Sequence, residues 1–432
     1  MDATTSLLTD RYELTMLELS LANGTASRRS VFELFARSLP RGRSYGVVAG
    51  TYRALSAIEN FRFGDPELSY LSSNGIVGSE TLDFLADFKF SGDAWGFLEG
   101  ELYFSGSPVL TIESTFAEAL VLETVLLSIY NHDSAVASAV TRMIDAAGDR
   151  SILEGGARRT HEGAAVSAAR AAYVAGVSAT SNLEAGRTHR IPTVGTIGHA
   201  FIMSYPTEAE AFEAQLNVMG PDTTYLVDSY DIANGIRTAF EVVGPKLGAI
   251  RIDSGDLALE TKLARHLLNE LGARDTKIVA SGDLNEWSIL ALSAAPIDSY
   301  LVGTAIPNGS GHPTAAMVYK LVATETASGE MVPVQKRSEG KATYGSRKAA
   351  FRVLDSAGNL ERDVLIPAPH IPITDVNGPG RRLQVPLIRR GEVVGQPTLK
   401  ATRNWCAHVR QELPDDARLP DTDRTFTSFV TD

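Results

Sequence analysis

Short apolar runs alternate with amphipathic segments from residue 151 to about residue 305. Residues 223–256 show the pattern well, because the runs TYLVD and LGAIRID are rich in β-branched and aliphatic residues and each carries an aspartate at its end. Between them, Ile232, Ile236 and Phe240 recur at helical spacing before Gly244-Pro245. This pattern predicts a strand, a helix and a second strand. Parallel strands joined in this way place their carboxyl ends at one edge of a sheet.

Further units of the same kind surround this stretch. VSATSN and IPTVGTIGH read as short strands, and residues 206–220 read as an amphipathic helix with a Thr207-x-x-Glu210 capping box. Phe212, Leu216 and Met219 are expected on its inner face. Six or seven βα units can be counted, which favours a barrel, complete or one strand short, over an open sheet.

The flanking regions follow other patterns. Residues 6–21 predict a helix capped near Thr9, and SVFELFARSLP predicts a strand with Phe32, Leu34 and Ala36 inward. Residues 116–147 carry one long, mostly apolar helical pattern, and strand patterns return after Met317. We therefore expect an α+β sandwich domain (1–115), buried linking helices (116–150), a catalytic barrel (151–325), a β-rich segment that packs back on the first domain (326–400) and a tail (401–432).

Composition narrows the possible classes of protein. The 432 residues are 44% hydrophobic and 21% charged, as in soluble globular proteins of two or three domains. A net charge of −12 without a long basic stripe argues against nucleic acid as a partner. The single cysteine, Cys406, fits a reducing compartment, and neither a signal peptide nor a membrane-spanning run is recognisable. We expect a cytoplasmic protein.

Polar residues gather at the inferred carboxyl ends of the barrel strands. Arginines suit phosphate or carboxylate, glycines let backbone N–H groups approach a phosphate, and aspartates can hold Mg²⁺ or ribose hydroxyls. This combination predicts a phosphorylated sugar as ligand. The candidate residues are Arg158, Arg159, Ser181, Asn182, His199, Asp228, Arg251, Asp253, Asp256, Gly282, Asp283, Gly303 and Thr304.

Each candidate also has a purely structural interpretation. Residues 253–256 could form an Asx turn, Arg158-Arg159 a solvated pair, and His199 a hydrogen-bonded core histidine. Five polar clusters at one sheet edge are harder to explain in that way. The residues leave open a sugar-phosphate isomerase or aldolase and an inactive binding barrel. The absence of lysine at an inferred barrel strand end weakens a Schiff-base aldolase.

An ordered set of motifs between Leu7 and Arg352 resembles the nicotinate phosphoribosyltransferases. The motifs are LLTDRYELTM, GGARRTH, GTIGHAF, LVDSYD, IRIDSGD, VASGDLNE and YLVGT. The resemblance implies an α/β sandwich domain, an irregular, decapped β/α barrel and a homodimer with shared active sites. It also implies NAD salvage: nicotinate and 5-phosphoribosyl 1-diphosphate would give nicotinate mononucleotide and diphosphate, with Mg²⁺ and ligase-like coupling to ATP hydrolysis.

The same resemblance implies roles for single residues. His199 matches the histidine that ATP phosphorylates transiently, and Arg158 and Arg251 match residues facing the pyridine carboxylate and the diphosphate. Asp228 and Asp253 match carboxylates near the ribose hydroxyls and the metal. The loops for the 5′-phosphate and ribose correspond to Gly282, Asp283, Gly303 and Thr304.

Two positions bear on how the pyridine ring is recognised. Tyr12 matches an aromatic residue that stacks on the ring across the dimer, whereas its own sequence pattern favours core packing. Gly155 stands where many relatives carry a phenylalanine that completes the ring sandwich, so stacking is either one-sided or completed by another aromatic residue. A nicotinamide phosphoribosyltransferase is the closest alternative, and the arginine pair of GARR favours an acid as substrate.

Overall fold

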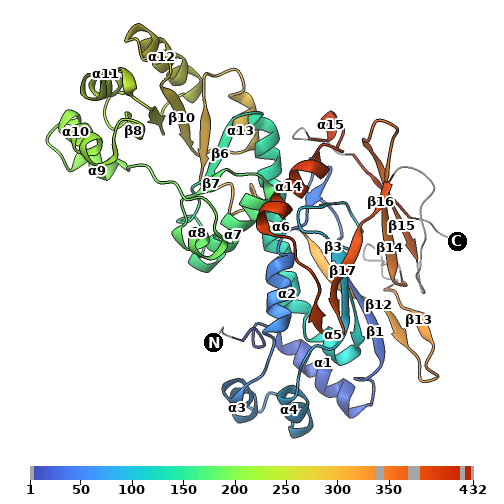
Figure 1. Cartoon of the computed structure of the whole chain (residues 1–432). Helices are drawn as coiled ribbons and strands as arrows, with labels where there is room; N and C mark the ends of the chain where they lie inside the picture. Colours follow the sequence, from blue (N-terminus) through green and yellow to red (C-terminus); the bar gives the residue numbers. More distant parts are fainter. Residues whose placement is uncertain (1–3, 337–344, 368–379, 419–423, 430–432) are drawn as a thin grey trace. The chain divides into compact units, whose positions relative to one another are not determined.

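The computed structural model describes residues 4–336, 345–367, 380–418 and 424–429. The chain forms two compact units, one from residues 1–138 and 314–432 and the other from residues 139–313 (Figure 1). The chain therefore leaves the first unit and returns to it. This division does not decide the finer five-segment description drawn from the sequence, which stays a prediction.

The first unit is built on a seven-stranded sheet in the order β13-β12-β1-β5-β3-β17-β18. Strand β1 (Arg29–Ala36) lies antiparallel between β12 (Met317–Glu325) and β5 (Leu110–Thr115). Strand β3 (Asp93–Phe97) likewise pairs with β17 (Gln384–Arg389). The prediction that C-terminal β segments complete the N-terminal domain is confirmed. The remaining strands are β2 (Gly46–Val47), β4 (Leu102–Tyr103), β13 (Met331–Pro333), β14 (Lys348–Leu354), β15 (Leu360–Pro367), β16 (Gly380–Arg382), β18 (Glu392–Val393) and β19 (Thr427–Phe429).

Helices pack on this sheet around a buried core. Phe32, Leu34 and Ala36 are buried in it, as the strand pattern predicts. The predicted long helix at 116–147 is two helices, because the chain breaks helical geometry at residues 121–122. The helices are α1 (Arg11–Ala22), α2 (Thr51–Glu59), α3 (Asp65–Ser73), α4 (Ser79–Ala86), α5 (Phe116–Leu120), α6 (Glu123–Ala147), α14 (Leu399–Arg410) and α15 (Asp415–Arg418). Over the described ranges, no helix combines the length and the apolar character that crossing a bilayer needs.

Helix α1 differs from its prediction at its start. Its N-cap is Asp10, whose carboxylate accepts a hydrogen bond from the Tyr12 N–H, whereas the Thr9 hydroxyl donates to Glu13. The buried face runs through Leu14 and Leu17, so the Tyr12 side chain lies at its margin and is 43% exposed. Core packing within the subunit, which the pattern alone favours for Tyr12, is therefore wrong.

Glu13 is the buried carboxyl group of this helix. Its oxygens accept hydrogen bonds from the Thr124 N–H (2.9 Å) and from the hydroxyls of Thr9 and Thr124. Burial nevertheless raises the pKa of Glu13 from 4.5 to about 7, which exceeds the opposing effect of these hydrogen bonds. The folded state thus holds a proton that the unfolded chain releases at lower pH.

We expect Glu13 to make the first unit less stable as pH rises from about 5 to about 8, by at most about 1.4 kcal/mol per pH unit. The stabilisation that comes from the proton held on Glu13 is fully present below pH 4.5. It is lost as pH rises through 7, because the pKa of Glu13 is higher in the folded state than in the unfolded chain. Glu13→Gln should flatten this dependence in denaturant unfolding followed at several pH values. The exposed Glu59→Gln on α2 is the control, and equal slopes for Glu13→Gln and wild type would contradict the expectation.

The second unit contains a six-stranded parallel sheet in the order β7-β6-β11-β10-β9-β8. Within this fully described unit, β7 and β8 are the two edges of the sheet, so the β/α barrel is open rather than closed. The strand–helix–strand prediction for residues 223–256 is confirmed. The strands are β6 (Ser151–Glu154), β7 (Ala179–Thr180), β8 (Thr224–Leu226), β9 (Ala249–Ile252), β10 (Lys277–Gly282) and β11 (Ser299–Val302).

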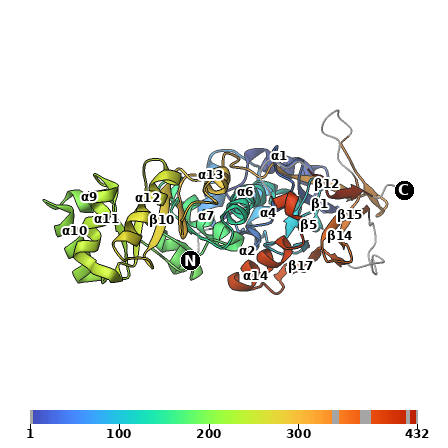
Figure 2. The same ribbon diagram turned by 90° about the horizontal axis from the view of Figure 1, so that it is seen from above.

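Helices of the second unit follow the strands in alternation, except that α8, α9 and α10 all stand between β7 and β8. Helices α9 to α12 gather in one group, in which α10 contacts α9 and α11, and α11 contacts α12 (Figures 1 and 2). The Ile236 and Ala239 side chains of α11 are buried in the core of this unit. The helices are α7 (Glu162–Ala175), α8 (Leu183–His189), α9 (His199–Met203), α10 (Glu208–Met219), α11 (Ile232–Val243), the short 3₁₀ turn Gly244–Lys246, α12 (Leu257–Glu270) and α13 (Glu286–Ala291).

Two local predictions in this unit need correction. The strand predicted within 191–199 is not formed, and only a bridge between Thr180 and Thr193 joins this segment to the sheet. Pro192 has no N–H to donate, and the glycines that follow favour irregular backbone. In α10, Thr207 does cap the helix and Phe212 is buried, but Met219 is about half exposed and Gln215 is buried in its place.

Candidate active site

The six parallel strands bring their carboxyl ends to one edge of the second unit. Gly155 follows β6, Ser181 follows β7, Asp253 follows β9 and Gly303 follows β11, while Gly282 ends β10. The carboxyl edge of a parallel sheet is where barrel and doubly wound folds place their ligands. Two adjoining pockets open at this edge.

The first pocket, which we call the anion pocket, has a volume of about 250 Å³. Eight of the residues predicted from the sequence line it, together with Gly155, Ser281 and Leu301. The eight are Arg158, Arg159, Arg251, Asp253, Gly282, Asp283, Gly303 and Thr304. Three arginines and two strand-end glycines around one small cavity suit a phosphate-bearing ligand.

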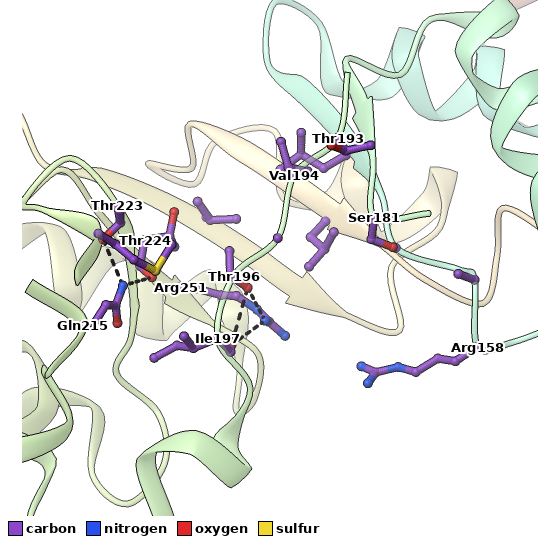
Figure 3. Close-up of a pocket in the computed structure, with 17 residues that line it drawn as sticks. Arg158, Ser181, Thr193, Val194, Thr196, Ile197, Gln215, Thr223, Thr224 and Arg251 are labelled. Carbon is purple, nitrogen blue, oxygen red and sulfur yellow. Dashed lines mark hydrogen bonds between the residues drawn. The ribbon is translucent and has the colours of Figure 1, made fainter. Parts of the chain in front are cut away.

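The second pocket, which we call the inner pocket, has a volume of about 580 Å³. Leu153, Val279 and Leu301 line it from the strands, and Ser181 and the segment 193–197 line it from the loops (Figure 3). Its volume lies within the roughly 300–1,000 Å³ typical of small-molecule sites. The two pockets share four lining residues, Gly155, Arg158, Arg251 and Leu301, and so adjoin along one wall.

Arg251 is the most constrained cation of the site. Its Nε donates to Ser281 Oγ (2.8 Å), Nη1 to Thr196 Oγ1 (2.8 Å) and Nη2 to Asp253 Oδ1 (2.9 Å). Figure 3 shows the guanidinium groups of Arg158 and Arg251 reaching toward the same opening from opposite sides. Because its side chain is 11% exposed and held at three nitrogens, Arg251 presents a fixed positive charge to both pockets.

Asp253 carries negative charge beside this arginine. Burial acts to raise the pKa of Asp253, but hydrogen bonds from Ser281 and Arg251 outweigh that effect. The positive charge of Arg251 acts in the same direction as the hydrogen bonds. The pKa of Asp253 therefore lies below its ordinary value, and the group is a carboxylate at neutral pH.

Asp228 connects His199 to the turn after β9. One carboxylate oxygen lies 3.2 Å from His199 Nε2, and the other accepts hydrogen bonds from the Asp253 N–H (2.9 Å) and the Ser254 hydroxyl (2.7 Å). The Asp228 side chain has no exposed surface, whereas that of His199 is 38% exposed. His199 is therefore an oriented surface group at the site and not a core histidine.

Two predicted residues have local structural contacts at this edge. Asn182 caps α8 by accepting a hydrogen bond from the Ala185 N–H (3.0 Å), and Asp256 caps α12 by accepting from the Ala258 N–H (3.0 Å). Neither lines the anion pocket or the inner pocket, whereas Ser181 lines the inner pocket. Tyr12 belongs to the first compact unit. Asp256 thus acts as the cap of the following helix, while Asp253 faces the pocket.

Sequence reasoning missed several residues that support the site. Ser281 contacts both Arg251 and Asp253, and Thr196 contacts Arg251. Glu154 is buried beneath the GGARR turn, where it accepts hydrogen bonds from the Gly156 N–H and the Thr180 hydroxyl, and burial raises its pKa. Alternation along VASGD, which puts Ser281 on the same face as Val279, was the one signal that could have identified Ser281.

Gly155 shows what takes the place of a ring-stacking side chain. A Cβ at this position would lie 2.9 Å from Leu301 Cδ1, so the leucine occupies the space above the glycine. The wall here is aliphatic, and within this fully described unit no Phe, Tyr or Trp lines either pocket. The three lysines of the fully described second unit, Lys246, Lys262 and Lys277, line neither pocket, which argues further against a Schiff-base aldolase.

The acidic residues differ in their fit to a magnesium ion. Over the described ranges, no group of three or more histidine, cysteine, aspartate or glutamate side chains is placed to hold a metal. Both Asp228 oxygens are engaged by protein groups, which makes this residue a poor ligand. Asp253 is anionic, 31% exposed at its side chain and faces the anion pocket, so it fits as one protein ligand to an ion that substrate phosphates also hold.

Comparison with known proteins places these features in context. Residues 7–131 match the model of the nicotinate phosphoribosyltransferase (NAPRTase) N-terminal domain. The chain is 50% identical over 418 residues to nicotinate phosphoribosyltransferase pncB1 of Mycobacterium tuberculosis, an alignment covering 95% of this chain and 91% of the relative. It is 39% identical over 370 residues to nicotinate phosphoribosyltransferase of Bacillus subtilis, covering 83% and 75%.

Among solved structures, human nicotinic acid phosphoribosyltransferase is similar in fold. Its TM-score is 0.82 at 22% sequence identity, covering 98% of this chain and 97% of the human chain. The prediction of a β/α barrel with an N-terminal sandwich domain is confirmed by this likeness and by the sheets described above.

Proposed function

Because the chain belongs to the nicotinate phosphoribosyltransferase family, we propose that it joins nicotinate to 5-phosphoribosyl 1-diphosphate, giving nicotinate mononucleotide and diphosphate. The main support within the molecule is the convergence of Arg158, Arg251 and Asp253 on one pocket whose rim carries Gly282 and Gly303. The product is a pyridine nucleotide, which places the enzyme in NAD salvage.

The chemistry follows from the charges around the pocket. The bond between ribose C1 and the diphosphate oxygen breaks, and a bond from C1 to the pyridine nitrogen forms. Arg158, Arg159 and Arg251 offer positive charge to the departing diphosphate and to the carboxylate of the ring. Asp253 stays ionised and can accept a hydrogen bond from a ribose hydroxyl. Its negative charge also stabilises the positive charge that develops on the sugar. A magnesium ion bound with the diphosphate would supply further neutralising charge, and Asp253 is the carboxylate that would hold it.

Coupling to ATP would involve His199. When Nε2–H donates its hydrogen bond to Asp228, the neutral ring keeps a lone pair on Nδ1, which makes that nitrogen the nucleophile. The Nδ1–phosphorus bond forms as the bond from the γ-phosphorus to the bridging oxygen breaks, so ADP leaves. Hydrolysis of the phosphohistidine later releases phosphate. The position of His199 beside Asp253 would let this charge change act on the nearby ribose site.

A homodimer would supply the remaining part of the ring site. The Tyr12 side chain is 43% exposed, and its hydroxyl hydrogen-bonds to Glu123 within its own subunit. An exposed aromatic ring held at its hydroxyl end is suited to stack on a flat ligand presented by a partner subunit. This assembly would complement the aliphatic wall formed by Leu301.

Nicotinate is preferred over nicotinamide on grounds of charge. Three arginines and two aspartates line the anion pocket, and Arg158 and Arg251 also line the inner pocket, which contains no carboxylate. A ring carboxylate can pair with a guanidinium at two points, whereas a neutral carboxamide gains no such ion pair.

The proposal is tested by measuring diphosphate release with 5-phosphoribosyl 1-diphosphate, Mg²⁺ and ATP, comparing nicotinate and nicotinamide side by side. Release with nicotinate and little with nicotinamide is expected. Release with nicotinamide alone would overturn the substrate but keep the reaction. No release with either would instead favour a different sugar-phosphate enzyme on the same barrel.

Gly303 tests whether the pocket binds phosphate through a close backbone approach. An added Cβ would meet only the Gly155 carbonyl oxygen at 3.9 Å, so Gly303→Ala should fold normally. The methyl group would occupy space at the rim of the anion pocket, and we expect the KM for 5-phosphoribosyl 1-diphosphate to rise about tenfold.

Gly282→Ala serves as the contrasting variant. Gly282 has φ of 127°, and an added Cβ would lie 3.3 Å from the Asp253 carbonyl oxygen. Backbone strain should therefore lower stability by about 1–3 kcal/mol in addition to raising KM. Initial-rate kinetics and thermal unfolding separate the two effects, and an unchanged KM in Gly303→Ala would remove the assigned phosphate contact.

A further inference from the structure

The wall shared by the two pockets is formed at one point by Gly155 and Leu301. Leu301 Cδ1 and Cγ lie 2.9 and 3.4 Å from the position that a Cβ on residue 155 would take. The backbone at Gly155 does not have positive φ, so its conformation does not demand glycine. What the position lacks is room, because the leucine side chain fills it.

Leu301 stands on the face of the sheet that lines both pockets. In the parallel register it is opposite Leu153 on β6 and Ser281 on β10. Leu153 lines the inner pocket and Ser281 lines the anion pocket, whereas Leu301 lines both. Its side chain is only partly buried. The leucine is therefore a wall residue between the two cavities and not part of the sealed core.

The surroundings of this wall fix how an aromatic acid would lie against it. Arg158 and Arg251 line both pockets, so a ring whose carboxylate pairs with them rests against Gly155 and Leu301. Leu301 also lines the inner pocket of about 580 Å³, whose other apolar lining includes Leu153, Val194 and Val279. A leucine can change rotamer to admit a larger group, and no side chain on residue 155 blocks that movement.

We propose that Leu301 determines substrate specificity, and that the Gly155–Leu301 wall lets the enzyme use pyridine-3-carboxylates enlarged at ring carbon 5. This proposal rests on the proposed function. Carbon 5 is flanked by neither the ring nitrogen nor the carboxylate, so a substituent there leaves the bond-forming atom and the ion pair unobstructed. The substituent then extends past Leu301 into the inner pocket.

The test compares nicotinate, 5-methylnicotinate and 5-ethylnicotinate as substrates of the full-length protein, with diphosphate release as readout. In wild type, kcat/KM for 5-ethylnicotinate should lie within about tenfold of that for nicotinate. Leu301→Phe should narrow the space between the two pockets and lower the ratio of kcat/KM for 5-ethylnicotinate to kcat/KM for nicotinate by about a hundredfold or more. Leu301→Ala should instead shift the preference toward 5-ethylnicotinate, and it needs no extra room to fold.

Leu263→Phe, at a position 54% exposed on α12, is the matched control and should behave as wild type. Wild type that uses nicotinate but rejects 5-ethylnicotinate more than about a hundredfold would overturn the proposal and leave the proposed function standing. If wild type uses 5-ethylnicotinate and neither Leu301→Phe nor Leu301→Ala changes that use, the role of Leu301 is overturned. A wild type inactive with nicotinate would mean that the proposed function itself has failed.

Discussion

Asp253→Ala is expected to lower kcat/KM for nucleotide formation by about a thousandfold or more, with the fold intact. The carboxylate lines the anion pocket and accepts a hydrogen bond from Arg251 Nη2 at 2.9 Å. Without it, the pocket keeps Asp283 as its one carboxylate against three arginines, and Arg251 loses one of its fixed contacts. Ser281 and Thr196 still hold the guanidinium, so the loss should lie in kcat more than in thermal stability.

Asp253→Asn separates charge from shape. The amide keeps one oxygen for Ser281 or Arg251 but carries no negative charge, and we expect it to recover little of the lost activity. Asp231→Asn, which retains an N-cap on α11 at the same sheet edge, is the control for the chemical change. Near-normal turnover by Asp253→Ala, with a circular dichroism spectrum like that of wild type, would contradict the assignment of Asp253 to the reaction.

His199→Ala is expected to keep slow transfer and to lose stimulation by ATP entirely. The histidine is the exposed member of a pair whose other member, Asp228, is fully buried, so removing the ring leaves the turn after β9 held by the Asp228 hydrogen bonds. The basal reaction then depends on the arginines and Asp253, which stay in place. Rates measured with and without ATP, together with transfer of labelled γ-phosphate to the protein, report the two activities separately.

Two comparisons make the His199 experiment decisive. His266→Ala removes an exposed histidine on α12, where it pairs only with Glu270, and should leave both ATP stimulation and labelling unchanged. Asp228→Asn keeps the ring of His199 but weakens its hydrogen-bond acceptor, and should reduce labelling. Full ATP stimulation in His199→Ala would eliminate the phosphohistidine role.

Much of the barrel and of its site can be predicted from the sequence because the signals are local. Alternating apolar runs and helical periodicity over residues 223–256 fix the order of strand, helix and strand, and polarity at the strand ends points to Arg251, Asp253 and Gly303. Parallel βα units always direct such residues to one edge. The sequence by itself therefore determined the class of fold, the edge that carries the site and most residues of the anion pocket.

Only the tertiary structure decided which of these residues touch. Ser281 joins Arg251 and Asp253 through the register of β9 and β10, and Asp256 turns away to cap α12. The clearest example of a contact decided by the tertiary structure is Leu301, which fills the space beside Gly155 although 146 positions (301 − 155) separate them in the chain. The periodicity of the sequence predicts which face of its own helix or strand a side chain lies on. Its packing and hydrogen bonds depend on which other elements the fold brings next to that face.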